Sequence, residues 1–310
     1  PSKLKRSHQL PADQFEYQNC YSRDRPQILE VLLCVLVPRS DHRSLCHYRH
    51  YVPELIEVEL YREAATRAAN RTVSSVSIST QKYLKEGTLL TDLQTAVCGS
   101  QLVSARRTGK LLLLEIGTAV IGVRFGMTGR LMVDGEATIN GLLYTTSEVK
   151  QEHIRFVMNF DGGGTLAVVD PRSFGNVELN PDETSLGPDA MHISNENLDR
   201  LFTGSRATVK GVLLDQTKIS GIGNLLCDEI LWRSGLSPTR AGDSLNAEEI
   251  ERVHRIIRST IGLLTKRGGS HMGDLQSERH RNGVCPTDGT QLEQTKVAGR
   301  TSWWCPEHQL

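Results

Sequence analysis

The C-terminal tail of this 310-residue chain carries four side chains of the types that bind zinc. Cys285 and Asp288 form one pair with two residues between them, and Cys305 and His308 form a second pair with the same spacing. Sixteen residues separate the pairs, and thiolate, imidazole and carboxylate are all zinc ligands. The spacing predicts a zinc ribbon, with His280 as a competitor of Asp288. Two unrelated cysteines in a polar tail are the alternative interpretation.

A second motif is the glycine-containing turn KISGIGN (218–224), which leads into a helical pattern. Glycine lets the backbone approach a ligand closely, and the free N–H groups at a helix N-terminus favour an anion such as phosphate. The turn therefore fits a phosphate contact. A plain helix-turn-helix connection capped by Asn224 fits it as well.

Two further charged residues, Glu54 and Lys110, lie at the beginnings of predicted elements. Pro53 and Glu54 open an acidic segment that, taken alone, reads as an ordinary capped helix start. Lys110 follows a basic cluster and heads the apolar run Leu111–Leu114, where a lone lysine is usually a solvated strand end. Only the combination with other motifs gives these residues a chemical meaning.

The elements that would position these residues follow from the hydrophobic periodicity. Helical spacing begins at Pro53, closely spaced strand patterns follow, and helical spacing returns from about residue 195. This order predicts an α+β chain with an antiparallel sandwich followed by a helical domain and a C-terminal knuckle. The expected strands are Lys110–Glu115, Val120–Phe125, His153–Phe160 and Thr165–Asp170, with a turn at 161–164. The expected helices are Asn195–Phe202, Ala207–Leu214, Asn224–Ser234 and Ala247–Thr265.

Composition narrows the functional classes. Lys plus Arg equals Asp plus Glu at 36 each, so any nucleic-acid contact must come from local sites. The apolar run Ile28–Val37 is far shorter than the roughly 20 residues that span a bilayer. Seven cysteines do not form a dense disulfide framework, which favours a reducing cytoplasm. Cys227 and Cys98 are weak candidate nucleophiles. Cys227 lies in an apolar helical pattern, and buried thiols of that kind are usually inert.

Read together, the motifs from Pro53 to the C-terminus resemble the formamidopyrimidine-DNA glycosylase and endonuclease VIII enzymes. The proline-glutamate start, the lysine-headed strand, RFGMTG (124–129), DPRSFG (170–175), the glycine turn and the terminal zinc finger occur in the family's order. The resemblance implies a β-sandwich catalytic domain over 53–180, a helix-two-turn-helix domain over 181–275 and a zinc-finger hairpin over 276–310. Residues 1–52 would be an extension.

The resemblance also implies catalytic roles. Pro53 would attack C1′ of a damaged nucleotide with its amine, Glu54 would transfer protons as the sugar opens, and Lys110 would contact the lesion or its phosphate. Glu57 would have a supporting role. The activity implied is excision of oxidised or ring-opened bases followed by β- and δ-elimination at the abasic site.

Damaged double-stranded DNA is the implied partner, bound by a monomer in the bacterial cytoplasm at the nucleoid, with no membrane contact and with one structural zinc ion. The target base must leave the stack, so other side chains must fill the gap. By resemblance, the intercalating side chains are Met127, Arg172 and Phe174. The phosphate contacts are Lys210, Asn224, Arg300 and Arg124. The segment between Gly268 and Cys285 is too short for the loop that caps 8-oxoguanine in some relatives, so the lesion class stays open.

The position of Pro53 inside the chain conflicts with this chemistry. A proline nitrogen within a chain is a tertiary amide and cannot attack a sugar carbon. We expect residues 1–51 to be mistranslated upstream sequence, with the valine codon at 52 acting as initiator. The alternatives are a catalytically inactive DNA-binding relative with a blocked Pro53, and a structural nucleic-acid module.

Overall fold

The computed structural model describes residues 52–139 and 149–310, all within a compact unit that begins at His47. The predicted extension therefore lies outside the described residues, except for Val52. No helix in the described ranges combines the length and apolar character that a bilayer crossing requires. The buried hydrophobic residues of these ranges lie between Leu55 and Cys305.

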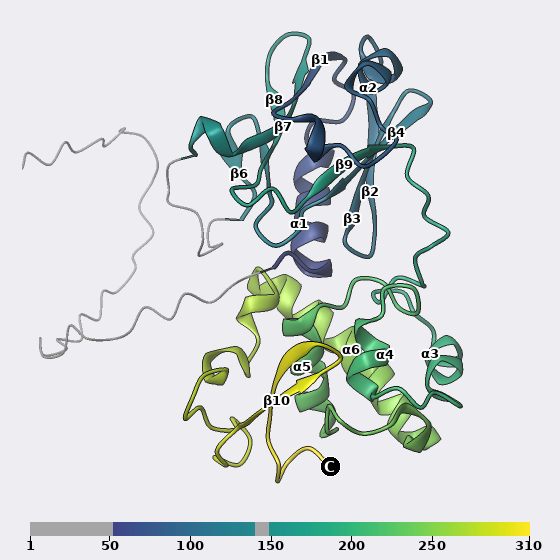
Figure 1. The fold of residues 1–310 in the computed structure, drawn as a ribbon, viewed down its shortest axis with the longest axis vertical. Helices are drawn as coiled ribbons and strands as arrows, with labels where there is room; N and C mark the ends of the chain where they lie inside the picture. Colours follow the sequence, from purple (N-terminus) through teal and green to yellow (C-terminus); the bar gives the residue numbers. More distant parts are fainter. Residues whose placement is uncertain (1–51, 140–148) are drawn as a thin grey trace, which may run out of the picture. The chain divides into compact units, whose positions relative to one another are not determined.

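The first half is built from helix α1, Leu55–Thr66, and two antiparallel sheets (Figure 1). One sheet has the order β1-β7-β8-β5-β6 and the other has the order β2-β3-β4-β9. The strands are β1 Val73–Ile78, β2 Leu102–Thr108, β3 Leu111–Ile116, β4 Ala119–Arg124, β5 Arg130–Val133, β6 Glu136–Ala137, β7 Ile154–Phe160, β8 Thr165–Val169 and β9 Asn176–Leu179. The predicted α+β class and antiparallel pairing are confirmed.

A single hydrophobic core joins both sheets and α1. Its members include Met158 from β7, Leu114 from β3 and Tyr61 from α1, all fully buried. All four leucines of the run LLLL (111–114) are fully buried, and Leu112 and Leu114 belong to this core. The turn at 161–164 joins β7 to β8 with three glycines at positive φ, a conformation that glycine adopts without steric cost.

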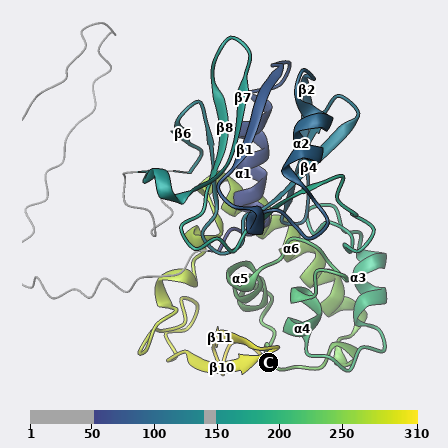
Figure 2. The same ribbon diagram turned by 45° about the horizontal axis from the view of Figure 1, so that its top comes forward.

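The second half contains four helices with a core of their own (Figure 2). They are α3 Asn195–Phe202, α4 Val209–Leu214, α5 Asn224–Ser234 and α6 Ala247–Arg267. The predicted start of α4 at Ala207 shifts by two residues because Thr208 acts as its N-cap and accepts a hydrogen bond from the Gly211 amide at 3.1 Å. Helix α6 extends two residues past Thr265, to Arg267. Gly268, whose φ is +94°, caps its C-terminus.

The first turn of α1 joins the helical core rather than the sandwich core. Leu55 and Ile56 pack with the helices, whereas Val58 and Tyr61 pack with the sheets. The start of α1, which follows Pro53 and Glu54, therefore lies where the two cores meet. The hairpin of β10, Glu293–Val297, and β11, Arg300–Trp304, packs against α5.

Candidate active site

Glu54 is the most constrained carboxylate of the site. Its side chain is buried and accepts three backbone hydrogen bonds at the N-terminus of α5, from Gly223 at 3.1 Å, Leu225 at 2.9 Å and Leu226 at 3.0 Å. Those amides belong to the glycine turn and the helix that follows it. The predicted anion-binding turn thus binds a carboxylate of this chain, which sits at the positive end of a helix dipole.

The charge state of Glu54 reflects opposing influences. Burial raises its pKa, while the positive charge of Lys110 lowers it, Glu57 raises it and the backbone donors lower it; the net result is a raised pKa. A buried carboxyl group with a raised pKa holds its proton to higher pH than an exposed glutamate does. Such a group can act as a proton donor at higher pH than an exposed glutamate can.

Lys110 lies in the same cleft. This cleft has a volume of about 660 Å³ and is lined by four basic side chains and one carboxylate. The basic residues are Lys110, Arg172, Arg279 and Arg300, and the carboxylate is Glu54. Burial lowers the pKa of Lys110, Glu54 opposes this shift and Arg300 adds to it. A cleft with this excess of positive charge attracts a polyanion.

Pro53 lines a smaller adjoining cavity of about 210 Å³, which it shares with Lys110 and Arg124. Val52 lines both cavities and precedes the proline through a peptide bond. In this chain the proline nitrogen is therefore an amide next to the cleft. An amine at this position would face the side chain of Lys110 across the same cavity.

Glu57 holds the start of α1 in place. Its carboxylate accepts hydrogen bonds from the Glu54 amide at 2.9 Å, the Ser270 amide at 2.6 Å and the Ser270 hydroxyl at 2.9 Å. Because it joins the proline-glutamate start to the segment after α6, its contacts fit the supporting role expected of it.

The expected intercalating residues lie on two loops that pack against each other. Asp170 is fully buried and accepts hydrogen bonds from the Thr128 hydroxyl at 2.5 Å and the Gly175 amide at 2.8 Å, which ties both loops together. The guanidinium of Arg172 lies 4.6 Å from the ring centre of Phe174, and this ring is 53% exposed. Such an exposed aromatic side chain on a braced loop is suited to contact a ligand.

We expect Gly126→Ala to disturb these loops. Gly126 has a φ of +58°, and an added Cβ would lie 2.4 Å from the Phe174 carbonyl carbon. Backbone must move to admit it, so we expect loss of stability by more than about 1 kcal/mol and weaker DNA binding. Gly135→Ala is the matched control, because its φ is +81° but nothing lies within 4 Å of the added Cβ. Equal urea midpoints and equal DNA affinities for the two variants would contradict the expectation.

Asn224 and Arg300 both line the large cleft. The Asn224 amide nitrogen donates to the Thr301 carbonyl at 3.0 Å, which fixes α5 against the hairpin that carries Arg300. Arg124 lines the smaller cavity, with its Nε 3.5 Å from a carboxylate oxygen of Glu178. These three residues stand at the walls of the cavities around Pro53.

Lys210 requires a correction. It was expected to contact DNA phosphate, but its side chain is fully buried and its Nζ lies 2.6 Å from both Asp228 Oδ1 and Ser302 Oγ. A buried ammonium paired in this way cannot reach a phosphate. The helical spacing of VKGVLL (209–214) gave no sign that the lysine faces inward; the hidden partner, Asp228, lies on another helix.

The C-terminal tail brings three of the four expected metal ligands together. Ligand atoms of Cys285, Asp288 and Cys305 lie within 4.8 Å of one another. Cys305 Sγ is 3.4 and 3.6 Å from the Asp288 oxygens. A sulfur and an oxygen ligand of the same tetrahedral zinc ion lie about 3.5 Å apart. His308 is outside this group, and its Nε2 lies 2.8 Å from the Trp232 carbonyl oxygen. His280 is also outside it, with Nδ1 2.9 Å from the Arg281 carbonyl oxygen.

Cysteine chemistry finds little support in the structure. Cys227 is fully buried in the helical core, and burial raises the pKa of its thiol strongly. A protonated, enclosed thiol is a poor nucleophile. Cys98 is exposed but lines none of the described cavities.

Several site residues escaped the sequence analysis. Asp170 was quoted within a motif without a role, and Asp228 and Arg279 were not singled out. A usable signal was present for Asp228, because two adjacent acids interrupt the apolar helix NLLCDEILWRS. Buried acids of that kind usually have a buried partner.

Comparison with known families gives two matches along the chain. Residues 52–177 match the formamidopyrimidine-DNA glycosylase N-terminal domain, and residues 186–274 match the formamidopyrimidine-DNA glycosylase H2TH domain. A formamidopyrimidine-DNA glycosylase of Bacillus cereus is 31% identical over 282 residues, covering 82% of this chain and 98% of the relative. One from Cytobacillus firmus is 29% identical over 284 residues, covering 84% and 100%.

Solved structures agree with this match. A Lactococcus lactis Fpg variant bound to DNA containing Fapy-dG is similar to this chain with a TM-score of 0.71 and 25% identity, covering 83% of this chain and 99% of that protein. The same enzyme bound to THF-DNA and an inhibitor gives a TM-score of 0.72 at 25% identity, covering 83% and 100%.

Proposed function

This chain belongs to the formamidopyrimidine-DNA glycosylase family, a base-excision repair family of DNA glycosylases with abasic-site lyase activity, and we propose that its reaction is carried out by Pro53, Glu54 and Lys110. The observation that carries the proposal is the placement of Glu54. Glu54 directly follows Pro53 in the chain, and its carboxylate lies under the influence of Lys110 and binds the N-terminus of α5. One proton-transfer group is thereby held beside one potential amine.

The Pro53 amine, once exposed, bonds to C1′ of the damaged nucleotide as the bond from C1′ to the base breaks. An α-amino group has an ordinary pKa of about 7.7–8.0, so a useful fraction is unprotonated at neutral pH. Glu54 supplies a proton to the sugar ring oxygen as the ring opens, giving an iminium between the proline and C1′. Loss of a proton from C2′ then expels the 3′ phosphate in β-elimination, and loss of a second proton, from C4′, expels the 5′ phosphate in δ-elimination.

Lys110 stabilises the negative charge of the departing phosphate. Its ammonium shares the cleft with Arg300 and Arg172, so charge that develops on phosphate oxygens meets several donors. This support is electrostatic and needs no change in the fold. Asn224 and Arg300 contact the phosphates, as does Arg124 beside the smaller cavity.

Met127 and Phe174 fill the gap left by the extruded base, and Arg172 hydrogen-bonds the orphaned partner base. The packed loops and the exposure of the Phe174 ring support this role. The domain limits that we propose are 53–180 for the catalytic sandwich, 181–275 for the helix-two-turn-helix domain and 276–310 for the hairpin. The protein acts as a monomer on double-stranded DNA at the nucleoid, in the bacterial cytoplasm.

The reaction requires a chain that begins at Pro53. We propose that initiation at the codon of Val52 and removal of the initiator residue generate this end. The test is excision from duplexes that contain a ring-opened purine, an oxidised purine, an oxidised pyrimidine or a bare abasic site. Protein beginning at Pro53 is expected to release a damaged base and nick the strand, whereas the 310-residue chain binds the duplex without cleavage. Binding without base release or nicking by both forms would support an inactive DNA-binding relative.

We further propose that the tail holds one structural zinc ion through Cys285, Asp288, Cys305 and His308. The ligand atoms of the first three lie within 4.8 Å of one another, which supports the proposal, and the Trp232 carbonyl would take the Nε2 proton of His308 and leave Nδ1 with a lone pair. A backbone carbonyl that orients the imidazole in this way is typical of metal-ligating histidines. The bound ion would stiffen the hairpin that carries Arg300.

Metal content tests this assignment. Asp288→Ala is expected to lower the zinc content of the purified protein and weaken its retention against a chelator, because the carboxylate supplies a ligand. His280→Ala is the control, since its ring lies outside the cluster. Full zinc content in Asp288→Ala, with loss in His280→Ala, would show that the histidine is the ligand. Atomic absorption on freshly purified protein provides the measurement.

A further inference from the structure

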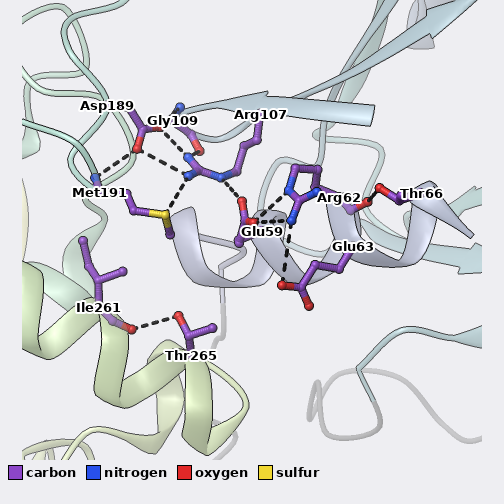
Figure 3. A network of polar contacts seen from close by, with 10 residues as sticks. All are labelled: Glu59, Arg62, Glu63, Thr66, Arg107, Gly109, Asp189, Met191, Ile261 and Thr265. Atoms are coloured by element: carbon purple, nitrogen blue, oxygen red, sulfur yellow. Dashed lines mark hydrogen bonds and ion pairs between the residues drawn. The ribbon is translucent and has the colours of Figure 1, made fainter. Parts of the chain in front are cut away.

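A polar network around Arg107 connects three segments that carry site residues (Figure 3). The Arg107 side chain is only 3% exposed. Its Nε donates to Glu59 Oε2 on α1 at 2.9 Å, and its Nη1 donates to Asp189 Oδ2 at 2.5 Å. One guanidinium therefore joins the helix that follows Pro53 to the segment that enters the helical half.

The same network holds the residue immediately before Lys110. Arg107 Nη1 donates to the Gly109 carbonyl oxygen at 2.9 Å, and the Gly109 amide donates to Asp189 Oδ2 at 2.7 Å. Both peptide groups of Gly109 are thus fixed, including the one shared with Lys110. The backbone of Gly109 is in the left-handed region, at φ +58°, and an added Cβ would lie 2.7 Å from Ser220 Cβ.

Asp189 is itself fixed to the glycine turn. Flanking amides and carbonyls pair the two segments, with the Ser220 amide donating to Pro188 at 2.9 Å and the Ala190 amide donating to Ser220 at 2.9 Å. That turn continues to Gly223, which donates to Glu54. The network therefore fixes the residue before Lys110, and it also contacts the turn whose amide binds Glu54.

We propose that Arg107 and Asp189 are positioning residues, which set the place of Lys110 relative to Glu54 and the glycine turn. The inference rests on the proposed function of Lys110. It states that a buried ion pair outside the cleft determines the position of that lysine. Neither residue lines the described cavities, so they act through Lys110 rather than on substrate.

Arginine is required at this position because three acceptors in different directions share one side chain. Glu59, Asp189 and the Gly109 carbonyl bind separate N–H groups of a planar guanidinium. A lysine ammonium keeps the charge but cannot reproduce that fork. Arg107→Lys should therefore leave the turn less fixed while retaining the positive charge.

Arg106 supplies a matched control one residue away. It is also an ion-paired arginine of β2, bound to Glu115 at 2.7 Å and to Glu183 at 2.6 and 2.7 Å. These partners hold neither peptide group of Gly109. Arg106→Lys removes a comparable fork without releasing the turn that bears Lys110.

The test is a double-mutant cycle in protein that begins at Pro53, using the single-turnover rate of strand cleavage at a preformed abasic site. Arg107→Lys is expected to slow this step by about 100-fold, as a misplacement of about 1 Å can. In a Lys110→Ala background the same change should cause no further slowing, because the residue that it positions is gone. Arg106→Lys should leave the rate near that of the parent in both backgrounds.

Asp189→Asn provides a second variant, because an amide still accepts the Gly109 hydrogen bond but loses the ion pair. It is expected to slow cleavage in the same direction and to show the same dependence on Lys110. Thermal unfolding fixes an assay temperature at which every variant is folded. The proposal is overturned if Arg107→Lys and Asp189→Asn cleave at the parental rate, or if their slowing multiplies with that of Lys110→Ala. Absence of cleavage by the parent protein would instead count against the proposed function.

Discussion

Replacement of Glu54 by glutamine is expected to slow base excision by about 100- to 10,000-fold, because the side chain can no longer transfer a proton. Burial gives this carboxyl group a raised pKa, so it stays protonated to higher pH than an exposed glutamate. Excision that depends on the protonated form falls as pH rises through that raised pKa, and Glu54→Gln should lack this limb of the profile. Single-turnover release of a ring-opened purine, measured across pH, checks both expectations.

The control for this change is Glu63→Gln on the same helix. Its side chain is 56% exposed and lines neither the large cleft nor the cavity next to Pro53. DNA affinity should be retained in both variants, which separates lost chemistry from lost binding. A Glu54→Gln enzyme that excises at nearly the parental rate would exclude Glu54 as the proton donor.

Loss of Asp228 is expected to have the largest effect on stability. Its carboxylate pairs with buried Lys210 and with Arg279, and it also accepts the Trp303 amide at 3.3 Å. Asp228→Ala leaves two cations without their partner, so we expect a drop in the free energy of unfolding of about 3–5 kcal/mol. Urea denaturation of the purified protein measures it.

Glu196→Gln is the matched comparison for that experiment. Glu196 pairs with Arg200, and both side chains are more than two-thirds exposed. Solvent screens such a pair, so its removal should leave the urea midpoint almost unchanged. Similar midpoints for Asp228→Ala and Glu196→Gln would contradict the importance of the buried pair.

Local patterns predicted the elements that carry strong local signals. Helices α3 and α5 have the predicted bounds, and the strands around LLLL (111–114) shift by one residue. Serine-rich β1, VSSVSI, and the eight-residue α2, Leu90–Val97, were not anticipated. Both elements are too short for periodicity alone to identify them, and their apolar residues pack against the shared core.

Contacts between distant segments could not be read from periodicity. The hydrogen bonds from Gly223, Leu225 and Leu226 to Glu54 join residues about 170 positions apart. The glycine turn was expected to contact a phosphate, but the group that its amides bind in this structure is a carboxylate of the same chain. Lys210 was wrongly expected to be exposed and to contact phosphate. Its partner, Asp228, is buried on another helix and could not be identified from the local pattern.

The distribution of α1 between two cores explains why this fold can place a chain end in a cleft. Leu55 and Ile56 are fully buried among the helices, whereas later turns of α1 are buried among the strands. Burial of both parts anchors the helix on either side of Glu57. Pro53, which directly precedes Glu54 and α1, lies at the wall of the smaller cavity.

The most direct measurement is borohydride reduction of protein that begins at Pro53, mixed with DNA containing an abasic site, followed by peptide mapping of the product by mass spectrometry. A covalent protein–DNA adduct on the N-terminal proline is the predicted result, and the 310-residue chain should give none. Absence of an adduct, or an adduct on Lys110 with the proline unmodified, would contradict the assignment of Pro53 as the nucleophile.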